Sequence, residues 1–258
     1  MVCRSQYNGS DCMSVFVPRS VVEIQDDAFW NCQDLREVVF EEGSALRTIG
    51  ASAFRESGVE CVDLPGSLRT LAQAAFAGCR NLRSVRLREG LKALGTRAEG
   101  QPWQGAFQGS ALEEVLLPST LRRIEHDTFR RCGRLRSVAL PAGLAYLGKQ
   151  CFCSSGLEAA VLPPALREIG RYAFYKCRRL RRVEFPEGLE TISLGAFHGS
   201  GIESAVLPAS LRTVAQGAFA RCGSLRTVVF RDGLEVLGTQ ECAADGRRFH
   251  GVFEDSAL

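Results

Sequence analysis

The stretch LRSVALPAGLAYLGKQCF, which runs from Leu135 to Phe152, shows the pattern that repeats along this chain of 258 residues. It contains a short apolar segment, a proline, a second apolar segment and a phenylalanine that is followed by small residues. The phenylalanine returns mostly at intervals of 22 or 23 residues, as Phe29, Phe54, Phe76, Phe107, Phe129, Phe152, Phe174, Phe197, Phe219 and Phe253. A unit of this length cannot bury its apolar side alone, so the repeat predicts a solenoid in which neighbouring units stack.

The apolar segment before the proline predicts one short strand in each unit. Seven of the nine prolines directly follow such a segment, for example Pro65 and Pro141. Proline has no backbone N–H, so it ends the hydrogen-bond ladder at that point. The sequence therefore predicts a parallel sheet that runs through a single solenoid at residues 13–258, with residues 1–12 as a partial unit.

The repeated pattern L-x-x-V-x-L-P, followed by L-x-x-I-G-x-x-A-F-x-x-C/G, resembles the BspA-like leucine-rich repeats over essentially all of residues 13–258. The resemblance implies an α/β solenoid, a right-handed leucine-rich-repeat array of about ten units, with a continuous parallel sheet on one side and short helical or irregular turns on the other. Proteins of this family are mostly binding and adhesion modules, often at cell surfaces, and are not known as catalysts. The resemblance thus implies a non-catalytic binding function.

Two types of unit alternate, and one type carries a cysteine three residues after the phenylalanine. These cysteines are Cys32, Cys79, Cys132, Cys177 and Cys222. On alternate turns they are expected roughly 10 Å apart, at ~4.8 Å per strand, whereas a disulfide bridges Cα atoms within ~7 Å. We interpret them as buried structural thiols. Cys151 and Cys153 form only a Cys-x-Cys pair without a nearby histidine, so no metal site is expected.

Charged residues of alternating sign precede the predicted strands. They are Arg36, Glu60, Arg83, Glu113, Arg136, Glu158, Arg181, Glu203 and Arg226. In a parallel stack they become lateral neighbours, and opposite charges then favour the correct register over a slip of one unit. We interpret this charge ladder as structural; the alternative is an anionic ligand that runs along the arginines.

One position in each predicted strand points outward by the alternation of a strand and is nevertheless apolar in most units. Leu116, Val161 and Val206 occupy this position and are candidates for contact with a partner. A long exposed apolar stripe marks a contact surface or a covered one. Because β-propensity alone could also select valine there, both interpretations are kept.

The repeat is interrupted at two places, where the usual step of five residues before the phenylalanine becomes 13 and 16 residues. The insertions predict two loops, at residues 95–105 and 238–251, that leave the solenoid on one edge. Candidate partner-binding residues in these loops are Trp103, Arg247, Arg248, Phe249 and His250. Insertions in repeat proteins often supply binding residues, although a tolerated remnant of a duplication would look the same.

Composition and charge exclude several classes of function. The net charge is only +3 and no nucleic-acid module occurs, so the arginines at residues 178–182 are interpreted as a solvated surface and no nucleic-acid partner is expected. No catalytic residue, metal, cofactor or small-molecule substrate is expected, because the three histidines lie at different positions of the unit and no nucleophile motif or phosphate loop occurs. No stretch approaches the ~18 to 20 apolar residues of a membrane span.

Two hypotheses of function remain from the sequence. The first is a repeat scaffold that mediates protein–protein or surface-adhesive interactions, and the second is a purely structural spacer in a longer repeat protein. Neither end has the polar cap that terminal repeats need, so the chain is expected to be a fragment. It shows no secretory signal peptide, which favours the cytoplasm for a complete chain and leaves the cell surface open for a fragment.

The loops generate a first test. Their bases are six units apart, so at ~4.8 Å per turn they should lie roughly 29 Å from one another, a distance that a macromolecular partner can span. Trp103→Ala and Phe249→Ala should each weaken such a partner at least tenfold, because truncation of an aromatic hot spot costs ~2 kcal/mol or more. Titration calorimetry gives the affinities, and the melting temperatures should stay nearly unchanged. Equal affinity in both variants would reject loop binding and leave the outward strand position as the candidate.

Overall fold

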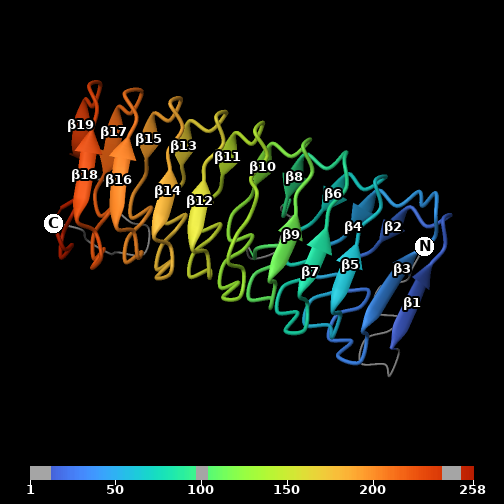
Figure 1. The fold of residues 1–258 in the computed structure, drawn as a ribbon. Helices are drawn as coiled ribbons and strands as arrows, with labels where there is room; N and C mark the ends of the chain where they lie inside the picture. The colour runs from blue at the N-terminus through green and yellow to red at the C-terminus, as the bar shows by residue number, and fades with distance from the viewer. Residues whose placement is uncertain (1–12, 97–103, 240–250) are drawn as a thin grey trace.

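The computed structural model describes residues 13–96, 104–239 and 251–258, and the chain winds there into about nine stacked turns (Figure 1). The turns follow one another in chain order, so each turn packs against the turn before it and the turn after it. Counting from one core phenylalanine to the next gives nine turns between Phe29 and Phe253, close to the ten units expected from the repeat.

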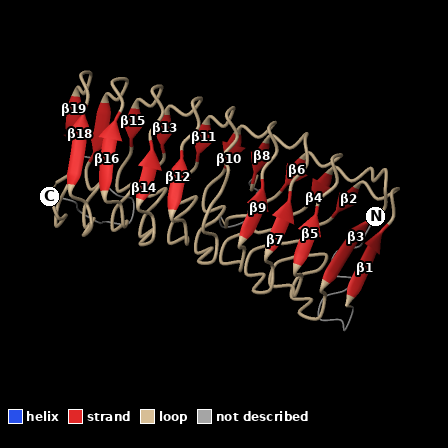
Figure 2. Ribbon diagram, in the orientation of Figure 1, coloured by secondary structure: helices blue, strands red, loops and turns tan. Residues whose placement is uncertain are grey.

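Most turns contain two short strands where the sequence predicted one, and the two sets form two layers of the solenoid (Figures 1 and 2). The front strands are β1 (Ser14–Val17), β3 (Glu37–Phe40), β5 (Cys61–Asp63), β7 (Ser84–Arg86), β9 (Glu114–Leu116), β12 (Ala159–Val161), β14 (Arg182–Glu184), β16 (Ser204–Leu207) and β18 (Thr227–Phe230). The back strands are β2 (Glu23–Ile24), β4 (Thr48–Ile49), β6 (Thr70–Leu71), β8 (Ala93–Leu94), β10 (Arg123–Ile124), β11 (Tyr146–Leu147), β13 (Glu168–Ile169), β15 (Thr191–Ile192), β17 (Thr213–Ala215) and β19 (Val236–Thr239).

All of these strands pair in parallel with the strand one turn away. The front strands form three hydrogen-bonded groups, β1 to β9, β12 with β14, and β16 with β18, and the back strands form two. The expectation of one continuous sheet is therefore wrong, because residues 137–140 form no strand and a second layer exists. The back strands escaped the sequence analysis because most contain only two residues, such as Thr48 and Ile49, which is too short to show an alternating pattern.

The described residues contain no helix, so the α/β part of the expectation is also wrong (Figure 2). The corners at the phenylalanines consist of turns, and at eight of the ten the backbone is left-handed both two residues before and two residues after the ring. At Phe107 and Phe253 it is left-handed only after the ring. Asp27 and Asn31 flank Phe29 with φ of 57° each, and Arg131 follows Phe129 with φ of 60°. A left-handed residue cannot continue a right-handed helix, so each corner reverses the chain within a few residues.

The centre of the core is a ladder of stacked phenylalanine rings. The ten rings of the repeat make nine consecutive contacts, with ring centroids 4.9 to 5.7 Å apart and ring planes within 13° of parallel. The backbone follows the same ladder, since the N–H of Phe29 donates to the carbonyl of Ala53 at 2.7 Å and that of Phe129 donates to Cys151 at 2.7 Å. Leucine, isoleucine and valine side chains of both strand layers pack around the rings in one cluster from Val17 to Val252.

The two types of unit differ in the length of this corner. The buried Leu135 comes six positions after Phe129 in a cysteine unit, whereas Leu157 comes five positions after Phe152 in the other type. The shorter corner passes close to the previous turn: the N–H of Gly156 donates to the carbonyl of Cys132 at 3.0 Å. A Cβ at Gly156 would meet the carbonyl oxygen of Gly133, so a side chain does not fit there.

This close approach can be tested with a pair of glycines. Gly156→Ala should lower the free energy of unfolding by about 1 to 3 kcal/mol, because the added methyl group overpacks the contact between two turns. Gly133→Ala is the matched control, since a Cβ there meets nothing within 4 Å, and it should be neutral or slightly stabilising. Urea unfolding of both variants measures the difference, and equal stabilities would contradict the packing described here.

Candidate functional site

The outward position of the front strands forms a row of exposed side chains that we call the front stripe. Its apolar members are Phe16, Val39, Leu116, Val161, Val206 and Val229, and Ala139 holds the equivalent position in the turn whose residues 137–140 form no strand. The candidates from the sequence are clearly exposed: 43% for Leu116, 60% for Val161 and 52% for Val206. The neighbouring residues of the same strands, such as Val115 and Ala160, point inward and are buried. The structure thus brings these residues into one row, and their role in binding stays a prediction.

Charged residues interrupt the front stripe towards the N-terminal end. Asp63 on β5 accepts two hydrogen bonds from the guanidinium of Arg88, at 2.9 and 2.6 Å. This hydrogen bonding to Arg88 lowers the pKa of Asp63, so the carboxylate stays ionised and paired. The pair borders a shallow depression of about 1000 Å³ on the front face, which Val39, Cys61 and Leu116 also line. The depression is open and mixed in polarity, and the carboxylates of Glu37, Glu41, Glu42 and Glu114 also line it.

The cysteines of the repeat lie buried at the corners, and each of four has a partner that the sequence analysis missed. Cys79 donates from its thiol to the carbonyl of Phe54 at 2.9 Å and contacts the hydroxyl of Ser57 at 3.5 Å. The same two contacts recur for Cys132 with Phe107 and Ser110, for Cys177 with Phe152 and Ser155, and for Cys222 with Phe197 and Ser200. The serine that stands three residues after the phenylalanine in alternate units is the feature of the sequence that could have indicated this partner.

Burial determines the ionisation of these thiols. It raises the pKa of Cys79, Cys132 and Cys177 to about 12, so the sulfur stays protonated and can donate to the carbonyl at any physiological pH. Cys151 and Cys153 are also buried, and burial raises their pKa as well. Among the residues described, no three histidine, cysteine or acidic side chains gather as metal ligands would.

The charge ladder is made of lateral neighbours, although few of its members form ion pairs. Arg181 contacts Glu203 at 2.5 Å, whereas Arg136 and Glu158 are 3.7 Å apart. Glu113 instead faces Arg134, at 3.4 Å, which the sequence analysis did not include in the ladder. Exposed pairs of this kind contribute about 0 to 1 kcal/mol each, so the ladder acts on register more than on stability.

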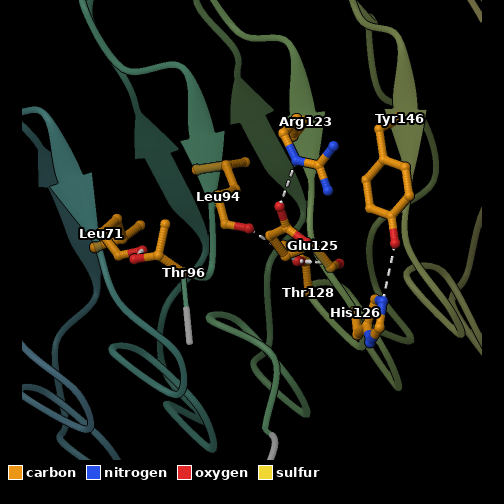
Figure 3. Close-up of polar contacts among 8 residues, drawn as sticks. All are labelled: Leu71, Leu94, Thr96, Arg123, Glu125, His126, Thr128 and Tyr146. Atoms are coloured by element: carbon orange, nitrogen blue, oxygen red, sulfur yellow. Dashed lines mark hydrogen bonds and ion pairs between the residues drawn. The ribbon is translucent and has the colours of Figure 1, made fainter. Parts of the chain in front are cut away.

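A polar cluster stands on the back strands beside the base of the first inserted loop (Figure 3). Arg123 donates to the carboxylate of Glu125 at 2.7 Å, and its guanidinium lies 3.9 Å from the ring centre of Tyr146. Tyr146 in turn shares a hydrogen bond of 2.9 Å with Nε2 of His126. Thr128 donates to the carbonyl of Glu125 at 2.7 Å. Burial lowers the pKa of His126, which favours its neutral form.

These contacts link two adjacent turns, and the polar side chains of the cluster bond mainly to one another. They give His126 a structural partner in Tyr146, and the charges of Glu125 and Asp127 also act on its ring. The loop candidates themselves, Trp103, Arg247, Arg248, Phe249 and His250, lie outside the described residues and stay predictions. The part of the chain that the structure describes has no helix with the length and apolarity to cross a membrane.

Comparison with known proteins gives a family and a fold. A sequence profile of the BspA type leucine rich repeat region, in six copies, matches residues 2–98 and 103–226. None of the curated proteins matches the chain. Among solved structures, a leucine-rich repeat protein from Bacteroides ovatus gives a TM-score of 0.52 at 20% identity, covering 88% of this chain and 74% of that one.

Two further solved structures are less similar. A leucine-rich repeat protein from Eubacterium ventriosum gives a TM-score of 0.49 at 17% identity, covering 98% of this chain and 79% of that one. The pneumococcal vaccine antigen PcpA gives 0.48 at 19% identity, covering 91% of this chain and 71% of that one. At such identities the likeness to the Bacteroides protein shows the fold alone.

The burial of the thiols leads to a prediction about their reactivity. At pH 8 a thiol reagent should label Cys61, which is exposed on β5. It should spare Cys79, Cys132, Cys177 and Cys222, because their raised pKa leaves almost no thiolate. Cys61→Ser should therefore remove one fast-reacting thiol, whereas Cys132→Ser should leave the native count unchanged. Unfolding without reductant should release at least the five corner thiols. Rapid labelling of Cys132 in the folded protein would contradict this assignment.

Proposed function

The chain belongs to the BspA-type leucine-rich repeat family, and on that premise we propose that it is a non-catalytic scaffold whose front stripe binds a protein partner. The observation that carries the proposal is the exposure of apolar side chains in one row over successive turns. Single exposed valines are ordinary on a protein surface, but several exposed apolar residues aligned in one row are typical of contact surfaces. A spacer would need apolar residues only on the inward side of each strand.

The geometry of the front stripe favours a macromolecule over a small ligand. Val206 pairs with Val229 and Phe16 pairs with Val39 in adjacent strands, so their side chains lie directly side by side. From Leu116 to Val229 the stripe crosses five turns, roughly 24 Å at ~4.8 Å per strand. Glu184 is the one charged residue in this length. A folded partner can cover such a row and remove its apolar surface from water.

The separation of the described histidines from the carboxylates in the outward position supports a non-catalytic function. The two carboxylates in the outward position, Asp63 and Glu184, stand five turns apart, and Asp63 is held by Arg88. His126 and His198, the two described histidines, lie at unlike positions, and His198 is buried against the ring of Tyr175 with 5.0 Å between ring centres. None of these groups can share one substrate.

Substitutions on and off the front stripe test the proposal. Binding partners are first captured from an extract of the source organism, identified and purified. Val161→Asp and Val206→Asp should then each weaken the purified partner at least tenfold, because a charge placed in a covered apolar contact must lose its water. Val22→Asp is the matched control, since Val22 is 54% exposed and lies off the stripe, and its affinity should stay within twofold. Equal affinity in all three variants would favour the spacer hypothesis.

A further inference from the structure

A second surface, distinct from the front stripe, lies on the edge where the phenylalanine corners lead into the front strands. Two corners carry positive side chains there, residues 130–136 and residues 174–181. The first lies in the turn between β9 and β12, and the second leads into β14 (Figure 1). We call this surface the basic edge. Its cations are Arg130, Arg131, Arg134, Arg136, Lys176, Arg178, Arg179 and Arg181. The carboxylates beside them are Glu113, Asp127, Glu158 and Glu203.

The basic edge holds more positive charge than the protein as a whole. Eight cations against four carboxylates leave a surplus of four, while the complete chain carries +3. The four cations outside the ion pairs are Arg131, Lys176, Arg178 and Arg179. Arg178 and Arg179 are exposed and have no carboxylate within ion-pair distance among the described residues. Their charge is therefore available to a partner.

The alternation of corner lengths gives this edge its shape. The longer corners of the cysteine units carry the arginines, and the shorter corner between them carries only Ser154, Ser155 and Gly156. A depression of about 610 Å³ results, lined by Arg134 and Arg136 on one side and by Arg179 on the other. The arginines on its two sides belong to turns roughly 10 Å apart, at ~4.8 Å per turn.

The two ion pairs in the depression are loose. Arg134 lies 3.4 Å from Glu113 and Arg136 lies 3.7 Å from Glu158, and all four side chains are more than half exposed. Strong pairs between guanidinium and carboxylate have N–O distances of about 2.7 to 2.9 Å. These arginines can therefore turn towards an incoming acidic group at little cost.

The equivalent depression two cysteine units earlier is different, which shows that the charge is not a property of the repeat. It is lined by Asp34, Glu56, Arg36, Arg80 and Asn81, so its charges are mixed. Arg80 follows Cys79 as Arg178 follows Cys177, and it thus occupies the same corner position. The shape repeats along the solenoid, and the positive surplus belongs to the later turns.

We propose that the depression between Arg134 and Arg179 on the basic edge binds a short acidic segment of a protein partner. Guanidinium groups bind carboxylates in bidentate pairs, and two arginines without partners can take two carboxylates. Three residues of an extended peptide span about 10 Å, the separation of the two corners. This surface lies apart from the front stripe and does not depend on the function proposed for it.

The carboxylates of the edge argue against nucleic acid. Phosphates follow one another every ~3.4 Å along a strand, so a nucleic acid lying across this edge would bring some of them close to Glu113 and Glu158. A peptide can place its acidic residues opposite Arg178 and Arg179 and leave neutral residues opposite the glutamates. The discrimination comes from the spacing of charges and is therefore open to experiment.

The test uses a fluorescent peptide of alternating acidic and small residues, with its amide analogue and a DNA duplex as comparison probes. By fluorescence anisotropy, the chain should bind the acidic peptide and not the amide analogue. The double variant Arg178→Glu/Arg179→Glu should bind the peptide at least tenfold more weakly, a loss of about 1.4 kcal/mol or more. Arg80→Glu, the matched control at the equivalent corner, should stay within twofold of the unchanged chain.

Further controls separate the possible results. Circular dichroism and the melting temperature verify folding, and Arg178→Gln/Arg179→Gln replaces the reversed pair if that pair destabilises the corner. Val161→Asp should leave peptide binding unchanged, so failure of the front stripe and failure of the basic edge can be told apart. Equal peptide binding by the double variant and the unchanged chain would overturn the proposal. Tighter binding of the DNA duplex than of the peptide, lost in the double variant, would also overturn it and assign the edge to nucleic acid.

Discussion

The stacking of each phenylalanine on the next is the contact that the rest of the solenoid depends on. The stacking fixes the position of each turn relative to its neighbours, because it is accompanied by a backbone hydrogen bond. The N–H of each phenylalanine donates to the carbonyl of the residue just before the next ring, as Phe29 does to Ala53 at 2.7 Å. The first insertion shows how strong this constraint is. Although the chain takes extra residues between Leu94 and Phe107, the ring of Phe107 stacks on Phe76 at 5.6 Å and on Phe129 at 5.5 Å. The insertion therefore leaves the ladder of rings unbroken at this point.

The corners accept local strain to keep this register. Within residues 13–96, 104–239 and 251–258, thirteen residues other than glycine have positive φ, and they lie two residues before or after a ring. Such a conformation costs roughly 1 to 2 kcal/mol per residue, which isolated turns could not sustain. Here the backbone of these residues bonds to the next turn, for example from Asn31 to Arg55 at 2.8 Å and from Lys176 to His198 at 2.8 Å. The strain is tolerated because the left-handed residues recur at equivalent positions in successive turns, so the backbones of stacked corners have the same shape and can bond to each other.

The sequence predicts those features of the structure that depend on a pattern repeated over many units, and it misses those that depend on one or two residues. The phenylalanine ladder, the buried corner cysteines and the exposed position of Leu116 and Val161 depend on spacing over many units, and spacing is visible in a single sequence. The back strands and the missing helices depend on two-residue segments and on left-handed residues such as Glu56 or Tyr172, whose type gives no sign of that conformation. Ser137 to Leu140 reads SVAL like neighbouring strands and still forms none, and nothing in its sequence accounts for this. The contact of Cys79 with Ser57 joins the cysteine of one type of unit to the serine of the other type, and the spacing within one unit does not reveal that these two positions meet.

The two kinds of surface differ because the repeat has two periods. Every turn contributes a residue to the front stripe, so apolar side chains in paired strands, such as Val206 and Val229, become direct neighbours. Only every second turn has the longer corner, so the arginines of the basic edge stand in groups with a recessed serine and glycine corner between them. A one-turn period suits a broad apolar contact, whose energy grows with area, whereas a two-turn period suits separate charged contacts, whose energy depends on position. The alternation of 22 and 23 residues therefore shapes the core and also sets the distance at which the protein presents its charges.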